Sequence, residues 1–156
     1  MPDYRERLWP SAWIYIAPLL LIPASILTLA PVSLPAGIVT GVILYGATAG
    51  ALTITSPTIE IGDGMLRAGR AEIAVEHTGH AVASFDADAR AETGVRLDAR
   101  AYLVIRGWVK PVVRIPIVDA DDPVPYWLVS SRRASELAAA VDAARLGSTG
   151  AGADRP

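Results

Sequence analysis

The chain has 156 residues, 52% of them hydrophobic, and its mean hydropathy of +0.36 is high for a soluble domain of this size. It contains no cysteine, which excludes disulfides and thiolate chemistry, and its formal net charge of −2 gives no electrostatic footprint for nucleic acid. A membrane segment is therefore the first feature to look for, and DNA or RNA is not an expected partner.

The N-terminal third of the chain contains an uncharged run of 52 residues, from Leu8 to Ile59. Soluble domains are about a quarter charged, so a gap of this length is typical of membrane-spanning segments. A turn over residues 30–37, with two prolines and a serine, divides the run into apolar stretches at 12–30 and 37–54. Each stretch is close to the roughly 20 residues that a helix needs to cross a bilayer core of about 30 Å. Residues 1–55 are therefore predicted to form an N-terminal tail and two transmembrane helices.

The composition of the two predicted helices indicates how they pack. Pro18 and Pro23 lie inside the first helix and are expected to kink it. The second helix carries small residues at a spacing of four, which let helix backbones approach closely. These residues are Gly37, Gly41, Gly46 and Gly50. The interpretation that we favour is packing within the hairpin, and the alternative is a homo-oligomer formed through the same glycines.

The distribution of basic residues predicts the orientation. Arg5 and Arg7 precede the first helix, whereas the loop at 31–36 has no Lys or Arg, so the positive-inside rule places the N-terminus in the cytoplasm. The first apolar run exceeds the roughly 7–15 residues of a signal-peptide core, and Pro31 follows its only small-residue cleavage candidate. We therefore expect an anchored, multi-pass plasma-membrane protein with both termini cytoplasmic and the lipid bilayer as a partner.

Residues 56–146 are predicted to form a mostly β domain that ends in a helix. An Asp-Gly turn between alternating apolar residues indicates a hairpin. The hairpin covers 58–69, further strand patterns occupy 71–86, 101–119 and 125–131, and 87–94 is a short helix or loop. A helix over 134–145 would place Leu137, Ala138, Val141 and Ala144 on the face that covers a sheet. The glycine-rich residues 147–156 are expected to be disordered.

This order of elements resembles bacterial pleckstrin-homology-like (PH-like) domains fused to membrane spans. The chain is also similar to the uncharacterised actinobacterial two-span membrane-protein family known as domain of unknown function 3093. The segments that carry the resemblance are "RLWPSAW" (7–13), "GMLRAGRAEI" (64–73), "DARAYLVIRGWV" (98–109) and "DPVPYWLVSSRRASELAAAV" (122–141). The resemblance implies an α+β fold: a transmembrane helical hairpin, then a small antiparallel β barrel or sandwich with a C-terminal helix. It implies no catalytic residue and no cofactor.

One candidate site lies where the last strand meets the last helix. Ser131, Arg132 and Arg133 could contact an anion there, because free N–H groups and the positive end of the helix dipole meet at this corner. No glycine-rich loop precedes the helix, however, and Glu136 already supplies negative charge to its first turn. We favour a strand-to-helix corner with solvated arginines.

A second candidate is the turn "RGWVKP". Trp108 lies between Arg106 and Lys110, a composition suited to contact with lipid headgroups or with a protein partner. The linker after the second helix is short, so this turn is our candidate for docking the domain on its own membrane. The alternative is that Trp108 folds back and closes one end of the β core.

Other candidate chemistry is weaker. His77 and His80 have no further histidine or cysteine to complete a metal site, and the aspartates of 119–122 lack the glycine and glutamate of a calcium loop. Ser84, His80 and Asp86 come from one short segment that cannot easily provide triad geometry. We therefore expect no catalytic residue, no metal and no cofactor.

Two functions follow from these patterns. The first is a membrane-anchored, non-enzymatic binding or scaffold protein with a cytoplasmic PH-like domain, whose partner could be another membrane protein. The alternative is a membrane-bound enzyme, or an accessory subunit of one, that binds a phosphate-bearing substrate at the Ser131/Arg132/Arg133 corner.

Overall fold

The computed structural model describes residues 3–153 and divides the chain into two compact units. Residues 9–56 form one of them, the helical unit. The other, the sheet unit, joins residues 1–8 to everything from residue 57 onward. The helical unit is thus an insertion in the sequence of the sheet unit. Its two ends continue into strands that pair with each other.

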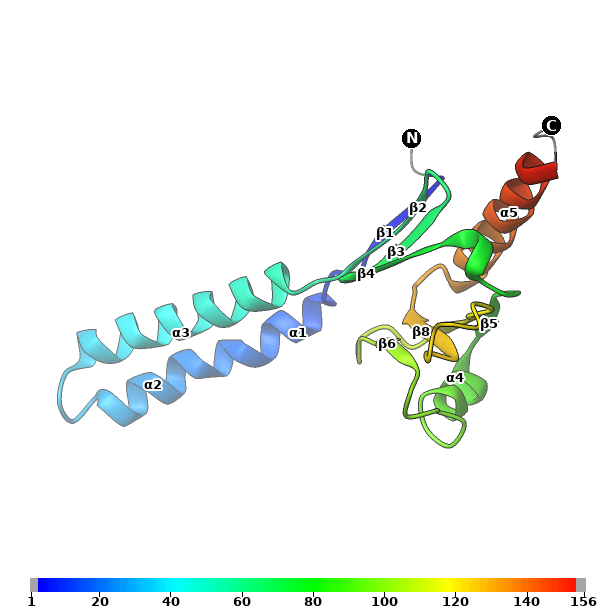
Figure 1. Cartoon of the computed structure of the whole chain (residues 1–156). Helices are drawn as coiled ribbons and strands as arrows, with labels where there is room; N and C mark the ends of the chain where they lie inside the picture. The colour runs from blue at the N-terminus through cyan, green and yellow to red at the C-terminus, as the bar shows by residue number, and fades with distance from the viewer. Residues whose placement is uncertain (1–2, 154–156) are drawn as a thin grey trace. The chain divides into compact units, whose positions relative to one another are not determined.

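The helical unit is an antiparallel helical hairpin, in which α3 runs beside the segments of the first helix (Figure 1). Its elements are α1 (Ala12–Ile16), a 3-10 turn (Ala17–Leu20), α2 (Leu21–Leu29) and α3 (Leu34–Ile54). Two spans, Ala12–Leu29 and Leu34–Ile54, are long and apolar enough to cross a membrane, with mean hydropathies of 2.0 and 1.7. The two predicted apolar helices are confirmed by their length and composition.

The prolines and a serine account for the local geometry of the hairpin. Pro18 lies in the 3-10 turn that separates α1 from α2, because proline cannot supply the N–H that a continuous α-helix needs. Pro23 sits in the first turn of α2, where its missing N–H costs little. The second helix begins at Leu34, earlier than predicted, because the Ser33 side chain accepts a hydrogen bond from the N–H of Ala36 and caps it.

Two of the four glycines on α3 face the first helix. A Cβ at Gly37 would lie 2.9 Å from the Cα of Ile26, and a Cβ at Gly41 would lie 2.8 Å from the Cα of Ile22. A Cβ at Gly46 or at Gly50 would meet no atom within 4 Å. Packing within the hairpin therefore uses the first pair of glycines and not the second.

A matched pair of substitutions tests this packing. In Gly41→Ala the new methyl group meets backbone, which cannot move aside, and overpacking of this kind costs about 1–3 kcal/mol. Gly46→Ala adds the same methyl group in open space and should leave the hairpin as stable as before or slightly more so, because alanine is the better helix former. Titration of the full chain with SDS in mixed micelles, followed by helical circular dichroism, gives both midpoints. Equal midpoints for the two variants would contradict the packing.

The first sheet of the sheet unit is an antiparallel meander in the order β1-β2-β3-β4. Its strands are β1 (Tyr4–Arg7), β2 (Thr58–Gly62), β3 (Met65–Ala68) and β4 (Ala71–Ala74). The hairpin predicted over 58–69 is confirmed. It turns at Asp63 and Gly64, whose φ angles of 53° and 73° match the two positive values of a tight hairpin turn.

Strand β1 corrects the expectation that the N-terminal residues are a tail. Tyr4, Glu6 and Leu8 are buried, and Arg5 and Arg7 between them are exposed, which is the alternation of a half-buried strand. The N–H of Leu8 extends the pairing by donating to the carbonyl oxygen of Pro57 at 3.0 Å. The charged residues of this segment therefore belong to an edge strand: Arg5 and Arg7 lie on its exposed face and Glu6 on its buried face.

The second sheet has the order β5-β7-β8-β6 and contains one parallel pair, β6 with β8. Its strands are β5 (Val82–Ser84), β6 (Tyr102–Val104), β7 (Val112–Pro116) and β8 (Tyr126–Ser130). This corrects the prediction of a wholly antiparallel domain, since β6 and β7 follow one another in the chain but do not pair. They flank β8 instead. All five residues of β8 are buried, as suits a strand covered on both faces.

Two apolar clusters cover the two faces of this sheet. The main core lies between the two sheets and α5 (Ala134–Ala153), and contains Ile59, Leu66, Val113, Ile115, Trp127, Val129, Leu137 and Val141 among others. The second cluster lies between the opposite face and α4 (Asp86–Glu92), and consists of Ala89, Val112, Tyr126 and Leu128. A 3-10 turn (Val75–His77) packs against α5.

Helix α5 presents its predicted face to the core. Leu137, Ala138 and Val141 are buried, and Ala144 packs against them. The helix continues to Ala153, through residues that we expected to be disordered, because its glycines weaken the helix without a proline to end it. Residues 154–156 of that predicted tail lie outside the described residues.

The sheet unit should fold without the hairpin if β1 is kept. A short glycine- and asparagine-containing loop in place of residues 9–56 would join Leu8 to Pro57 and turn β1 and β2 into an ordinary hairpin. We expect a soluble, cooperatively unfolding domain. A second chain that starts at Pro57 lacks the buried side chains of Tyr4 and Leu8, and its unfolding free energy should be lower by about 3 kcal/mol or more. Urea denaturation of the two chains checks this, and equal stability would contradict a structural role for β1.

Candidate functional site

The carboxylate of Glu6 is buried at the corner between β8 and α5. Its Oε2 accepts hydrogen bonds from the Tyr4 hydroxyl at 2.8 Å and from Ser131 Oγ at 2.5 Å. Its Oε1 accepts from the backbone N–H of Arg132 at 2.9 Å. Only 8% of Glu6 is exposed, and three donors from two distant segments satisfy its charge.

Arg133 closes the same corner from the outer side. Its backbone N–H donates to Ser131 Oγ at 3.0 Å, and its guanidinium donates to the carbonyl oxygen of Arg5 at 2.9 Å. The guanidinium also lies over the Tyr4 ring, 4.8 Å from the centroid, and forms an ion pair with Glu136 at 3.1 Å. We refer to Tyr4, Glu6, Ser131, Arg132 and Arg133 as the Glu6 corner.

The Glu6 corner explains what the sequence pattern had indicated. The Ser131 hydroxyl and the N–H of Arg132 do hold an anion, and the anion is a side chain of the same chain, while the N–H of Arg133 donates to Ser131 Oγ. Sequence reasoning missed Glu6 because it lies 125 residues from Ser131. The available signal was the alternation of Tyr4, Glu6 and Leu8, which predicts an inward-facing glutamate once the segment is taken as a strand.

Burial also sets the protonation of Tyr4. Removal of the phenol from water, with the neighbouring Glu6 carboxylate acting in the same direction, raises the pKa of Tyr4 to about 12. A raised pKa in the folded state means that the contribution of this phenol to stability is complete below pH 10 and is lost as the pH rises toward 12. At neutral pH the hydroxyl keeps the proton that it donates to Glu6.

The two histidines do not come together at one site. His77 Nδ1 lies 3.5 Å from a carboxylate oxygen of Asp119, whereas His80 Nδ1 lies 2.7 Å from Asp142. Asp142 also accepts the backbone N–H of Ala81, so it holds a turn in place. Within residues 3–153 no three His, Cys, Asp or Glu side chains gather as metal ligands would.

The turn after β6 separates the three residues that were predicted to act together. Trp108 is partly buried and packs against the main core, and its indole N–H is buried without a hydrogen-bond acceptor among the described residues. This favours the interpretation in which Trp108 closes one end of the core. Arg106 and Lys110 line a pocket on the other side of the turn.

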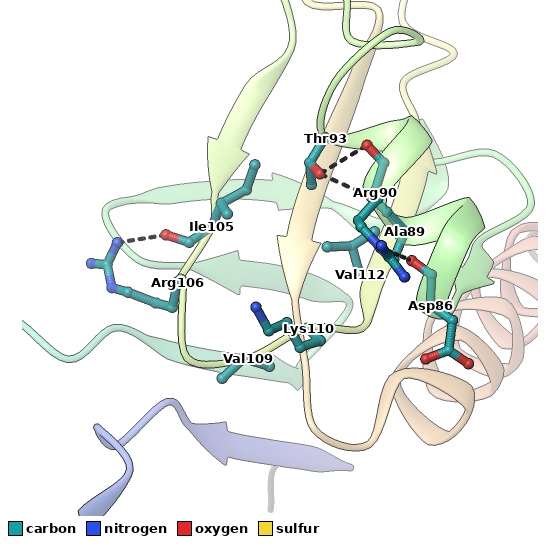
Figure 2. Close-up of a pocket in the computed structure, with 10 residues that line it drawn as sticks. Asp86, Ala89, Arg90, Thr93, Ile105, Arg106, Val109, Lys110 and Val112 are labelled. Atoms are coloured by element: carbon teal, nitrogen blue, oxygen red, sulfur yellow. Dashed lines mark hydrogen bonds between the residues drawn. The ribbon is translucent and has the colours of Figure 1, made fainter. Parts of the chain in front are cut away.

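This pocket has a volume of about 410 Å³ and lies between α4 and the turn (Figure 2). Helix α4 contributes Asp86 and Arg90 to it, the turn contributes Arg106 and Lys110, and Val112 lies at its base. We refer to it as the α4 pocket. Sequence reasoning did not connect Arg90 with the turn, because α4 is brought to the second sheet by tertiary contacts: the second apolar cluster and the Glu92–Arg114 ion pair.

One of the comparisons with known proteins identifies a family for this chain. The family model "Protein of unknown function (DUF3093)" matches residues 3–141, and the chain belongs to this family. The match extends from β1 through the helical hairpin to the buried face of α5. No curated protein and no solved structure matches the chain.

The Glu6 corner yields a prediction about stability. Glu6→Ala removes the acceptor of three buried donors, and each donor left unsatisfied costs about 1–3 kcal/mol, so the unfolding free energy of the sheet unit should fall by at least about 2 kcal/mol. Glu72→Ala is the matched control, since this glutamate forms an exposed ion pair with Arg67 that is worth about 0–1 kcal/mol. Urea denaturation followed by tryptophan emission measures both. Similar losses in the two variants would show that Glu6 does not hold β1.

Proposed function

We propose that this protein is a membrane-anchored, non-enzymatic binding or scaffold protein of the plasma membrane. In this proposal the helical unit spans the bilayer and the sheet unit is a cytoplasmic, PH-like binding domain. The observation that carries the proposal is the bare apolar surface of the hairpin. In the most apolar 18 residues of the first span none is buried, and in those of the second span 11% are buried. Its exposed large side chains include Trp13, Leu20, Leu27, Val39 and Ile43.

An apolar surface of this kind needs a cover. Single exposed hydrophobic residues are common on soluble proteins. A continuous apolar surface along two helices of 18 and 21 residues is instead the pattern that lipid accommodates. Several hydroxyl groups of the hairpin are hydrogen-bonded within it. For example, the Thr28 and Thr48 hydroxyls donate to carbonyl oxygens of their own helices.

Two of the polar side chains that the sequence suggested as candidates for catalysis, Ser131 and His80, are paired with other residues of the fold. Ser131 donates to Glu6, and His80 pairs with Asp142, so both side chains hold elements of the fold together. A phosphate-bearing substrate at the Ser131/Arg132/Arg133 corner, as the alternative enzyme requires, would have to displace the Glu6 carboxylate.

A PH-like assignment of the sheet unit is supported by its order of elements. Two sheets share one core, and a single C-terminal helix covers it. The parallel pairing of β6 with β8 departs from the antiparallel pattern of the resemblance. The actinobacterial origin that the same resemblance implies stays a prediction.

The proposed topology can be tested by cysteine labelling, because the chain has no cysteine of its own. Val32→Cys places one thiol in the loop between α2 and α3, and Ala139→Cys places one on the exposed side of α5. In intact cells a membrane-impermeant maleimide should label the first variant and leave the second unlabelled. After the cells are opened, it should label both.

The labelling experiment has a control and two outcomes that would contradict the proposal. A permeant maleimide should label both variants in intact cells, which shows that each thiol is accessible. Labelling of Ala139→Cys by the impermeant reagent in intact cells would place the sheet unit outside. Release of the wild-type chain from membranes by alkaline carbonate would overturn the anchor itself.

A further inference from the structure

Building on the binding function proposed above, we propose that the sheet unit binds a small phosphate-bearing anion in the α4 pocket. The pocket belongs wholly to this unit. Its volume of about 410 Å³ falls within the roughly 300–1,000 Å³ of small-molecule sites.

The base of the α4 pocket is apolar and firm. Ala89, Val109 and Val112 are 2%, 4% and 1% exposed, and they are held by the two apolar clusters that cover the second sheet. In the view of Figure 2, the side chain of Val112 lies between Arg90 on α4 and Lys110 on the turn. A rigid base positions the two cationic side chains at the rim.

The rim carries an excess of positive charge. Arg90, Arg106 and Lys110 line the pocket together with one carboxylate, that of Asp86. Arg90 Nε donates to the backbone carbonyl of Asp86 at 3.3 Å, and Arg106 Nη1 donates to the carbonyl of Ile105 at 3.0 Å. The carbonyl contact of Arg90 leaves the positive charge of its guanidinium in place.

Five other arginines of the sheet unit form ion pairs with carboxylates. Each of the following has a carboxylate oxygen within 3.5 Å: Arg67, Arg96, Arg100, Arg114 and Arg133. Within the described part of the chain, neither Arg90 nor Lys110 forms an ion pair, and Lys110 makes no hydrogen bond through its ammonium group. Two cations from separate segments thus line one pocket with their charges available.

The ligand class follows from these groups. A guanidinium donates along two parallel directions and an ammonium acts as a mobile point charge, and together they suit the several acceptor oxygens of a phosphate. The apolar base suits a short carbon skeleton attached to that phosphate. The headgroup of an anionic phospholipid and a soluble phosphate monoester share this chemistry.

The test uses the full chain in phosphatidylcholine nanodiscs and glycerol 3-phosphate as the probe, with binding followed by ³¹P line broadening at about 0.15 M salt, where long-range charge is screened. The wild-type chain should bind the probe. Arg90→Gln with Lys110→Gln should weaken binding about tenfold or more, because two charged donors are lost.

The matched control, Arg67→Gln with Arg70→Gln, removes the same charge from the first sheet and should change affinity by less than about twofold. If the wild-type chain does not bind the probe, or if the control loses as much affinity as the pocket variant, the proposal fails. Neither result bears on the anchor, which cysteine labelling tests separately.

A third variant should act in the opposite direction. Asp86 has a φ of 45°, a backbone conformation that asparagine tolerates well, so Asp86→Asn removes the opposing charge without strain. The affinity for glycerol 3-phosphate should rise about threefold or more. Unchanged or weaker binding would place the phosphate away from this pocket.

The two sources of phosphate can be separated with the same measurement. Replacing about a third of the phosphatidylcholine by phosphatidylglycerol should lower the apparent affinity for glycerol 3-phosphate if lipid headgroups fill the pocket, because screening suppresses simple repulsion at this salt. Undiminished affinity would assign the site to a soluble phosphate monoester.

Discussion

The hydrogen bonds to the Glu6 carboxylate are the interaction on which the sheet unit depends. A buried carboxylate without partners costs several kcal/mol, so β1 can occupy its place only when the hydroxyls of Tyr4 and Ser131 and the N–H of Arg132 are all in reach. Those donors lie in β1 itself and in the corner between β8 and α5. The pairing of β1 in the first sheet and the placement of α5 therefore depend on each other. The core between the two sheets is enclosed as a result.

A second buried glutamate plays a comparable part on the opposite face of the second sheet. Glu92, in α4, is 7% exposed and lies 3.3 Å from Arg114 on β7 and 3.4 Å from Arg96. Arg114 in turn lies 4.0 Å from the centroid of the Tyr126 ring. Each layer that covers the sheet is thus tied to it by one satisfied carboxylate. In contrast to these paired groups, Arg90 and Lys110 of the α4 pocket form no ion pair with a carboxylate within residues 3–153.

The extent to which sequence predicted this structure depends on the range of each interaction. Local signals were sufficient for the two apolar helices, for the Asp63-Gly64 turn and for the buried face of α5, because hydrophobic length, turn chemistry and helical period are all read within a few residues. The parallel pairing of β6 with β8 was missed, since adjacent strands separated by a turn normally pair with each other and here a third strand lies between them.

The site was harder to predict for the same reason. Residues 4–7 fit two patterns at once. Their alternation is that of a half-buried strand, and their arginines are basic residues before a long apolar helix, which is the feature that we used to predict the topology. Only tertiary contacts decide which carboxylate occupies the corner at Ser131. They also decide which helix faces the turn at Lys110. Sequence patterns named Ser131 and Arg132 as donors but could not name the Glu6 carboxylate that accepts from them.

The separation of 125 residues between Glu6 and Ser131 has a consequence for how the protein is made. Ribosomes add about 5–20 residues per second, so β1 leaves the exit tunnel several seconds or more before β8 and α5 exist. During that interval the Glu6 carboxylate lacks two of its three donors, while the two apolar helices that follow β1 have already been made. The sheet unit is completed only after nearly all of its chain has been translated, and a prematurely terminated product keeps Glu6 without Ser131 and Arg132, in a partly folded state that cellular proteases can recognise.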